Sequence, residues 1–343
     1  MRFSKLNSVL WCLLMMILLI GAVCFHVQVS SAVITAGKRC LISVLPSLYL
    51  FSIIAAFSVK AGLLETLAQP FQRVLKTDAV LLMTVLFSQI GGYPVGAQLV
   101  HGMYQERRIS EEQSRILICP CMGCGFGFLL ASFGGNTATA LFVWMMMSIP
   151  NLILALFLIR NIHTEPRESR QKKPFALLLT ESVESAASSM LKVTSMILAF
   201  SAVMGIAEGI FSDLPVIVRS ILEISNVSEY AQRGGSPALT ACLLSFGGIC
   251  VHLQIGAVCE NHIAWGKFWL CRMVTAGMTY GLCILGGNIL MSGKIPVFLY
   301  ETSVTDGQDV TFRIVPGCCL LLMSVLVLKK YDFCNKILTN HKK

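Results

Sequence analysis

Two short stretches of the sequence place a pair of glycines and a glutamine at the same spacing. The first reads SQIGGYPVGAQL (88–99) and the second reads LSFGGICVHLQI (244–255). Glycine lets the backbone approach a ligand closely, and a glutamine amide offers both a hydrogen-bond donor and an acceptor. The pattern predicts one site for a small polar ligand, to which both stretches contribute. Its candidate residues are Gly91, Gly92, Tyr93 and Gln98 in the first stretch and Gly247, Gly248 and Gln254 in the second.

Both stretches lie within long apolar runs, where glycines and Pro94 interrupt a helix. At membrane depth, irregular backbone is tolerated only where it is buried in protein or lines a wet cavity. Paired interruptions in corresponding halves of a chain are typical of a transporter binding site. Helix N-termini at such a site favour a bound anion. The alternative is that the glycines only allow helices to pack closely.

Four charged or polar residues are further candidates for this site. Arg115 and Arg272 follow the two stretches at nearly the same offset, so we expect them to attract an anion; alternatively, each reaches out to the lipid headgroups. Glu223 and Asn226, in the segment LEISN, are candidate substrate ligands or, alternatively, solvated loop residues. No arrangement of catalytic residues is recognisable. We therefore expect neither an enzyme nor a cofactor.

The segment CPCMGC contains Cys119, Cys121 and Cys124, which are potential soft-metal ligands because thiolates bind Cu(I) and zinc. Metal pumps with an intramembrane Cys-Pro-Cys also need a soluble ATPase domain. This chain has neither such a domain nor a phosphate-binding loop that ends in Gly-Lys-Ser/Thr. We expect no metal site here, and we expect the segment to be another interrupted helix.

The elements that must hold these residues are membrane helices. The chain has 343 residues, of which 55% are hydrophobic and 13% charged, whereas soluble domains have roughly 25% charged residues. A helix needs about 20 apolar residues to cross the hydrocarbon, so 116–159 is long enough for two passes with a turn near Gly134. We expect an all-α polytopic membrane protein with about eight transmembrane helices, re-entrant or broken segments, and two internal repeats. The apolar runs are 6–37, 40–59, 79–105, 116–159, 193–207, 234–259, 273–293 and 314–328.

The basic residues predict the orientation of the chain in the bilayer. Lysines and arginines precede the first span and follow the last, so both termini are expected to be cytoplasmic. The net charge of +9 therefore reports orientation, and we expect no nucleic-acid partner. Cytoplasmic termini require an even number of crossings, so segment 79–100 is expected to enter and leave on the same side; the alternative is that the rule fails at one short loop and the segment crosses. With re-entry, the connector 160–173 is cytoplasmic, and the acidic loop 292–312 faces the other side.

The connector divides the chain into halves of similar length. A polar stripe opens the second half and predicts an amphipathic stretch at the membrane surface before a span at 193–211. The stripe consists of Glu181, Glu184, Ser188 and Lys192. The expected units are a first transmembrane segment (1–37), a first repeat (38–160), a basic cytoplasmic connector (161–180), a second repeat (181–330) and a basic cytoplasmic tail (331–343).

Several segments together resemble one protein family. GGYPVGAQL, SEEQSRILICPCMGCGFGF, LEISN and, above all, LLSFGGICVHLQI are similar to the sporulation integral membrane protein YlbJ (SpoVV) family. That family belongs to the membrane proteins with a nucleoside-recognition or gate domain. The resemblance covers roughly residues 40–290. It implies a transporter that moves dipicolinate, a small aromatic dianion, during endospore formation.

The expected partners are a small-molecule anion as substrate and the lipid bilayer, with a homo-oligomer as an alternative to a monomer. The expected location is the bacterial cell membrane or the outer forespore membrane. Two other functions stay open at this point. One is transport of a nucleoside-like solute, and the other is a non-transporting role in assembling a sporulation membrane.

Overall fold

A computed structural model describes residues 2–72, 78–160, 162–165, 173–211, 214–260 and 262–291. The loop 292–312, the run 314–328 and the tail 331–343 lie outside these residues. Among the described residues the regular structure is entirely helical, which confirms the expected all-α class. The elements are α1 (Arg2–Cys24), α2 (His26–Arg39), η1 (Cys40–Val44), α3 (Leu45–Ala61), α4 (Leu63–Gln72), α5 (Ala79–Gly91), α6 (Tyr93–Gln105), α7 (Glu111–Leu117), α8 (Phe126–Ser132), α9 (Thr137–Leu158), α10 (Phe175–Ile210), α11 (Val216–Leu222), η2 (Ile224–Asn226), α12 (Val227–Gln232), α13 (Pro237–Phe246), α14 (Gly248–Val258) and α15 (Trp265–Met291).

The protein is an integral membrane protein, because several of its helices are long and apolar enough to cross a bilayer. Two bent helix pairs, within 8–42 and 48–72, each count as one further candidate span, and their halves meet at 95° and 72°. The described residues therefore contain four to six candidate spans, against about eight expected for the whole chain. The four unbent spans are Thr137–Leu158, Phe175–Ile210, Pro237–Val258 and Trp265–Gly287.

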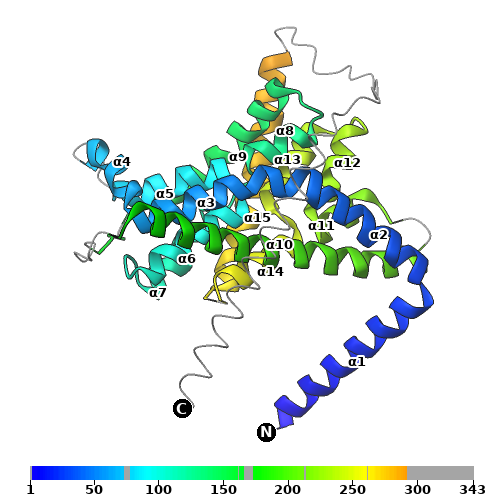
Figure 1. Ribbon diagram of the computed structural model, residues 1–343. Coiled ribbons are helices and arrows are strands. Elements are labelled where there is room, and N and C mark those ends of the chain that lie inside the picture. The colour runs from blue at the N-terminus through cyan, green and yellow to red at the C-terminus, as the bar shows by residue number, and fades with distance from the viewer. Residues whose placement is uncertain are drawn as a thin grey trace, which may run out of the picture.

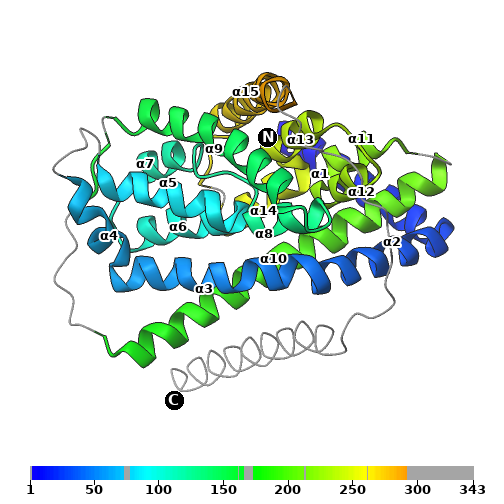
Figure 2. The ribbon, with the colours of Figure 1, turned by 90° about the horizontal axis from the view of Figure 1, so that it is seen from above.

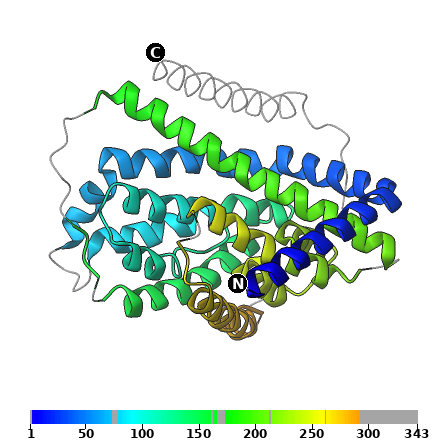
Figure 3. The same ribbon diagram turned by 90° about the horizontal axis from the view of Figure 1, so that it is seen from below.

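Two long helical stretches run side by side across the molecule (Figures 1, 2 and 3). One is α10, with 36 residues, and the other passes through α2, η1 and α3. They are antiparallel, because Gly205 near the end of α10 packs against Val29, whereas Glu181 near its start pairs with Lys60. These two stretches pack together along their length and lie beside the interrupted segments.

The stretch α2–η1–α3 stays helical between His26 and Ala61. Pro46 lacks a backbone N–H and so removes one helical hydrogen bond, which accounts for the wider π turn just before it at Cys40–Val44. The boundary expected at residue 37 falls inside this helix. The chain bends at Phe25 instead, where α1 leaves the body of the protein (Figure 1).

The first glycine stretch forms a hairpin of two helices. α5 ends at Gly91, Gly92 has φ 92° and ψ −178°, and α6 begins directly afterwards. The Thr84 hydroxyl lies 3.3 Å from the Met103 sulfur, 19 residues further along, so the two helices fold back on each other. The chain therefore reverses its direction between α5 and α6.

The second glycine stretch has a different structure. Gly247 and Gly248 have positive φ angles of 96° and 69° and separate α13 from α14. These helices do not fold back, and together they form the candidate span Pro237–Val258. Of the 18 most apolar consecutive residues in this span, 72% are buried inside the protein. Equal spacing in the sequence thus corresponds to a hairpin tip in one half and to an interruption within a span in the other.

The cysteine segment is a third interruption. Residues 116–133 were expected to make one full pass, but α7 ends at Leu117, irregular backbone follows, and α8 begins only at Phe126. The expected turn near Gly134 is present and leads into α9. The hairpin packs directly on this interruption, because a Cβ atom on Gly96 would overlap the carbonyl oxygen of Cys121.

This close packing can be tested with one methyl group. We expect Gly96→Ala to lower the free energy of unfolding by about 1–3 kcal/mol, because the hairpin must move away from Cys121. The matched control is Gly281→Ala in α15, where nothing lies within 4 Å; it should be neutral or stabilising by about 0.5–1 kcal/mol. Unfolding of the purified protein in detergent measures both changes. Equal stability of the two variants would contradict the packing described here.

Candidate functional site

The interrupted segments meet around a small cavity of about 50 Å³, which we call the central cavity. The hairpin tip contributes Gly92 and Tyr93, α14 contributes Gln254, and the segment before η2 contributes Glu223. Four of the predicted site residues are therefore brought together. The other lining residues are Val44, Leu48, Pro94, Cys124, Gly125, Phe128, Val193, Ile197, Ile224, Ser225 and Val251.

Tyr93 joins the two glycine stretches. Its hydroxyl donates a hydrogen bond to the carbonyl of Leu244 in α13. Its ring lies against Gly247, where an added Cβ would be 3.4 Å away. The two stretches predicted from the sequence thus meet through this side chain.

Gly91 and Gly248 do not line the central cavity. An added Cβ on Gly91 would collide with Val95 in the next turn of the hairpin, and one on Gly248 would lie 3.2 Å from the carbonyl oxygens of Ser220 and Ile221. For these two glycines the structure favours the packing explanation over direct contact with a ligand.

Glu223 is a buried carboxylate, 1% exposed, at the break between α11 and η2. It accepts hydrogen bonds from the backbone N–H and the hydroxyl of Ser225 and from the Asn226 amide at 3.4 Å. Arg39 of α2 donates to Ser225 at 2.8 Å and to Asn226 at 2.9 Å, and lies 3.7 Å from Glu223. The carboxylate is therefore balanced by a cation that sequence reasoning missed, since Arg39 is distant in the chain.

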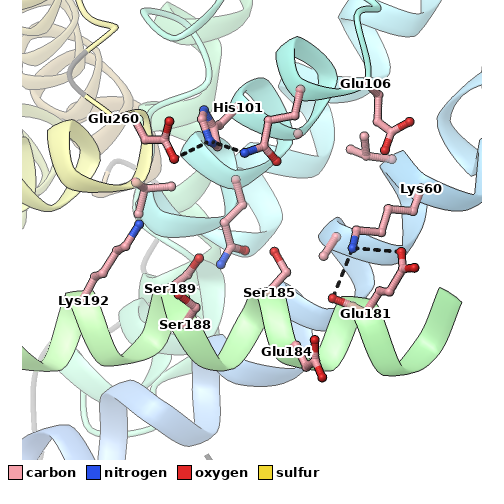
Figure 4. Close-up of a pocket in the computed structure, with 16 residues that line it drawn as sticks. Lys60, His101, Glu106, Glu181, Glu184, Ser185, Ser188, Ser189, Lys192 and Glu260 are labelled. Carbon is pink, nitrogen blue, oxygen red and sulfur yellow. Dashed lines mark hydrogen bonds and ion pairs between the residues drawn. The ribbon is translucent and has the colours of Figure 1, made fainter. Parts of the chain in front are cut away.

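Gln98 lies in a different cavity, which we call the Gln98 cavity. It has a volume of about 340 Å³ and lies between α3, α6 and α10, at the level of Ser185, Ser188 and Ser189 (Figure 4). Gln98 is 7% exposed, and neither amide atom has a hydrogen-bond partner among the described residues. Since buried amides are normally paired, this side chain is well suited to receive a polar ligand or water.

The charged residues of the Gln98 cavity are mostly paired. Lys60 contacts Glu181, and His101 lies 3.8 Å from Glu260 (Figure 4). The polar stripe of α10 faces this cavity and belongs to the same helix as the following span. The predicted amphipathic stretch and the span that follows it are therefore parts of one continuous helix.

A third cavity, the Arg219 cavity, has a volume of about 390 Å³ and lies between α2, α10 and the α11–α12 segment. Arg219 and Asn226 line it, so Asn226 lies in a different cavity from Glu223, although its amide donates a hydrogen bond to the Glu223 carboxylate. The other lining residues are Val27, Gln28, Ser31, Ala32, Thr35, Ala36, Arg39, Ser201, Met204, Glu208 and Glu229.

The three cavities follow one another along the length of α10, beside a stripe of residues that winds about half way around the helix. Glu181 to Lys192 line the Gln98 cavity, Val193 and Ile197 line the central cavity, and Ser201 to Glu208 line the Arg219 cavity. At 1.5 Å per residue the part of α10 from Glu181 to Glu208 is about 40 Å long, which is close to the thickness of a bilayer with its headgroups. Two polar cavities therefore flank a small central one beside a helix segment that is long enough to cross a membrane.

Arg272 is buried away from the central cavity and holds the cysteine segment in place. It is 1% exposed and donates to the carbonyls of Cys119 at 2.5 Å and Met122 at 2.8 Å, and to the Asn151 side chain at 2.9 Å. Asn151 in turn donates to Met122 and to Gln89. Irregular backbone inside a membrane needs such partners. The described contacts of Arg272 thus stabilise the fold. Nothing in the sequence signalled Gln89 and Asn151, because each is a single amide side chain in an apolar run.

Arg115 has a different environment from Arg272. It is exposed and forms an ion pair with Glu111 in its own helix at 2.6 Å. The two arginines therefore do not occupy equivalent places, and Arg115 contacts none of the three cavities.

The cysteines of CPCMGC are buried in the packed interruption. Among the described residues, no three His, Cys, Asp or Glu side chains are placed to hold a metal ion. Cys124 lines the central cavity as an apolar neighbour of Gly125.

Comparisons with protein-family models, with curated proteins and with solved structures found no match to this chain. The family resemblance therefore stays a prediction that rests on the quoted sequence segments.

The contrast between the two arginines gives a stability prediction. We expect Arg272→Gln to lower the free energy of unfolding by about 2–4 kcal/mol, because buried carbonyls lose charged hydrogen bonds. Arg115→Gln should cost less than about 1 kcal/mol, since an exposed ion pair contributes little. Denaturant unfolding in detergent measures both. A larger loss for Arg115→Gln would show that the assigned environments are wrong.

Proposed function

We propose that this protein is a membrane transporter for a small organic anion. The observation that carries the proposal is the row of three cavities along α10, which has membrane length and a constriction at its centre. A scaffold or assembly protein has no need of such a path. The three interrupted segments around the constriction support the same function, because broken helices at midplane are typical of transporter sites.

The central cavity is the proposed point of solute selection. At about 50 Å³ it is too small for an aromatic solute in this conformation, so passage requires the hairpin tip or its neighbours to move. Gln254 lines this cavity with a buried amide, and Gln98 presents its amide in the polar cavity beside it. A carboxylate that leaves water must recover its hydrogen bonds from fixed donors of this kind.

Dipicolinate is the proposed solute, on the resemblance to the YlbJ (SpoVV) family, and the proposed setting is endospore formation. The two arginines near the path, Arg39 and Arg219, suit a dianion. One observation favours the second candidate, a nucleoside-like solute: Glu223 lines the central cavity, and a carboxylate there repels a second carboxylate.

The proposed topology follows the positive charges. Residues 162–165 contact the open end of the α5–α6 hairpin, next to the Gln98 cavity. Thr164 donates a hydrogen bond to Asp78 before α5, and the Glu165 carbonyl accepts one from Arg108 after α6. If this connector is cytoplasmic, the Gln98 cavity opens to the cytoplasm and the Arg219 cavity opens to the other side. We also propose that the whole chain has eight spans and two repeats. Its proposed location is the cell membrane or the outer forespore membrane.

Uptake into liposomes tests the transport function. We expect the purified protein to take up labelled dipicolinate faster than labelled uridine. Gln98→Ala and Gln254→Ala should each reduce uptake about tenfold or more, because a hydrogen bond to a charged group contributes about 1.5–3 kcal/mol. Gln232→Ala is the matched control, since Gln232 is exposed and lines none of the three cavities. Uptake of uridine alone would support the second candidate, and no uptake of either solute would argue against transport.

Cysteine labelling tests whether the two polar cavities open to opposite sides. On a Cys-depleted background, Ser188→Cys in the Gln98 cavity should react with an impermeant thiol reagent from the cytoplasmic side only. Ser31→Cys in the Arg219 cavity should react from the other side only, and Val193→Cys should react slowly from both. Labelling of both serine positions from one side would exclude a path across the membrane.

A further inference from the structure

The thiols of Cys119 and Cys271 share a hydrogen bond, although the two residues are far apart in the chain. Cys119 begins the buried part of the cysteine segment, and Cys271 belongs to α15. A second contact brings the same two places together, because the guanidinium of Arg272, the residue after Cys271, donates to the Cys119 carbonyl at 2.5 Å. Both cysteines are free. Two unbonded sulfur atoms therefore lie in contact between the interruption and α15.

The two thiols differ in how easily a reagent reaches them. Cys119 is 2% exposed and packs in the core. Cys271 is partly exposed and adjoins an apolar side of α15 on which three side chains are each more than half exposed, namely Trp269, Leu270 and Met273. An accessible thiol beside a second thiol is the arrangement of redox-sensing cysteines, in which the first is oxidised and the second resolves it.

The pair is separate from the proposed solute path. Neither Cys119 nor Cys271 lines the central cavity, the Gln98 cavity or the Arg219 cavity. Other cysteines do not share the arrangement, since Cys121 and Cys124, in the same segment as Cys119, are both buried. A role in contacting the solute therefore does not account for the contact between these two thiols.

We propose that Cys119 and Cys271 are a redox modification site, at which a hydroperoxide joins them in a disulfide. The Cys271 sulfur takes the outer oxygen of the hydroperoxide, so that the O–O bond breaks, Cys271 becomes a sulfenic acid, and an alcohol is released. The Cys119 thiol then attacks the Cys271 sulfur, the S–O bond breaks, and the hydroxyl group leaves as water with the thiol proton. The two thiols together give up two electrons and two protons, and the hydroperoxide accepts them.

The disulfide fixes the cysteine segment to α15 by a covalent bond. In the reduced protein this connection is made by hydrogen bonds from Arg272 to the carbonyls of Cys119 and Met122. The hairpin packs on the same segment, with Gly96 against Cys121. The proposed function requires the hairpin tip or its neighbours to move, and the effect of the disulfide on transport rests on that function: the bond holds the segment under the hairpin in one position and slows transport.

Mass spectrometry of the purified full-length protein in liposomes tests the site. The protein is treated with hydrogen peroxide or with cumene hydroperoxide, the remaining thiols are blocked by alkylation, and the protein is digested without a reductant. We expect both oxidants to give a linked peptide pair that contains Cys119 and Cys271, and dithiothreitol to separate it. Hydrogen peroxide arrives from water and cumene hydroperoxide from lipid, so the faster reaction identifies the route. We expect the lipid route to be faster, because Cys271 adjoins an exposed apolar side of α15.

Serine variants test which thiol reacts first. Cys119→Ser and Cys271→Ser should each abolish the link. Cys119→Ser should also accumulate sulfenic acid on Cys271, which dimedone traps, because the resolving thiol is gone. The matched control is Cys242→Ser, which removes a partly exposed thiol from α13, a helix that packs against α15, and should leave the link unchanged. Thermal unfolding shows that each variant is folded, and the measurement on the wild-type protein needs no variant.

The proposal is overturned if the oxidised wild-type protein contains no Cys119–Cys271 peptide pair, if Cys271 pairs with a different cysteine, or if Cys242→Ser abolishes the link. Uptake in the same liposomes separates this site from the transport function. The linked protein should lose most of its uptake of labelled dipicolinate, dithiothreitol should restore it, and Cys119→Ser should not respond in this way. Equal uptake by the linked and the reduced protein would overturn the effect on transport, whereas a link in a protein that takes up no solute even when reduced would keep the modification site and reject transport.

Discussion

The structure depends on one constraint: backbone groups freed by an interrupted helix must find partners where no water reaches them. The cysteine segment leaves the carbonyls of Cys119 and Met122 without helical partners, and the Arg272 guanidinium supplies the missing donors from α15. Asn151 of α9 then connects Arg272 to Met122. A buried charge is costly unless it is hydrogen-bonded. The Nη1 and Nη2 atoms of Arg272 have such partners in the interruption, whereas its Nε atom has none among the described residues.

This constraint also explains where the glycines are needed. Once the cysteine segment is irregular, the hairpin can seal it only by lying backbone against backbone. Gly96 lies against the Cys121 carbonyl, and a Cβ on Gly92 would lie 2.8 Å from the Gly125 nitrogen. The small space left at the hairpin tip is the central cavity. The same close contacts that close the interruption therefore also shape the cavity beside it.

Much of the fold was predictable from composition, but the arrangement of the site was only partly so. The apolar runs predicted membrane helices, and the glycine pairs predicted breaks at Gly92 and Gly247, because only glycine adopts such φ angles easily. Spacing alone could not give the direction of the chain after each break. Gly92 has an extended ψ of −178°, and the chain reverses, whereas Gly247 has ψ −7° and the span continues. The match between Arg115 and Arg272 failed for the same reason, since equal offsets lead to different places once the preceding segments differ.

The residues that sequence reasoning missed share one property: each acts on a partner far away in the chain. Arg39 meets Asn226 across 187 positions, and Gln89 meets Asn151 across 62. A lone polar residue in an apolar run looks the same whether it faces lipid, caps a broken helix or lines a cavity, and only the antiparallel packing of α2–α3 on α10 decides which. That packing places the ends of α10 beside polar cavities and its middle, at Val193 and Ile197, beside the constriction. Because of this packing, the charged side chains that line the cavities gather beside the two ends of α10, and Glu223 is the one charged side chain among the described residues that line the small cavity between them.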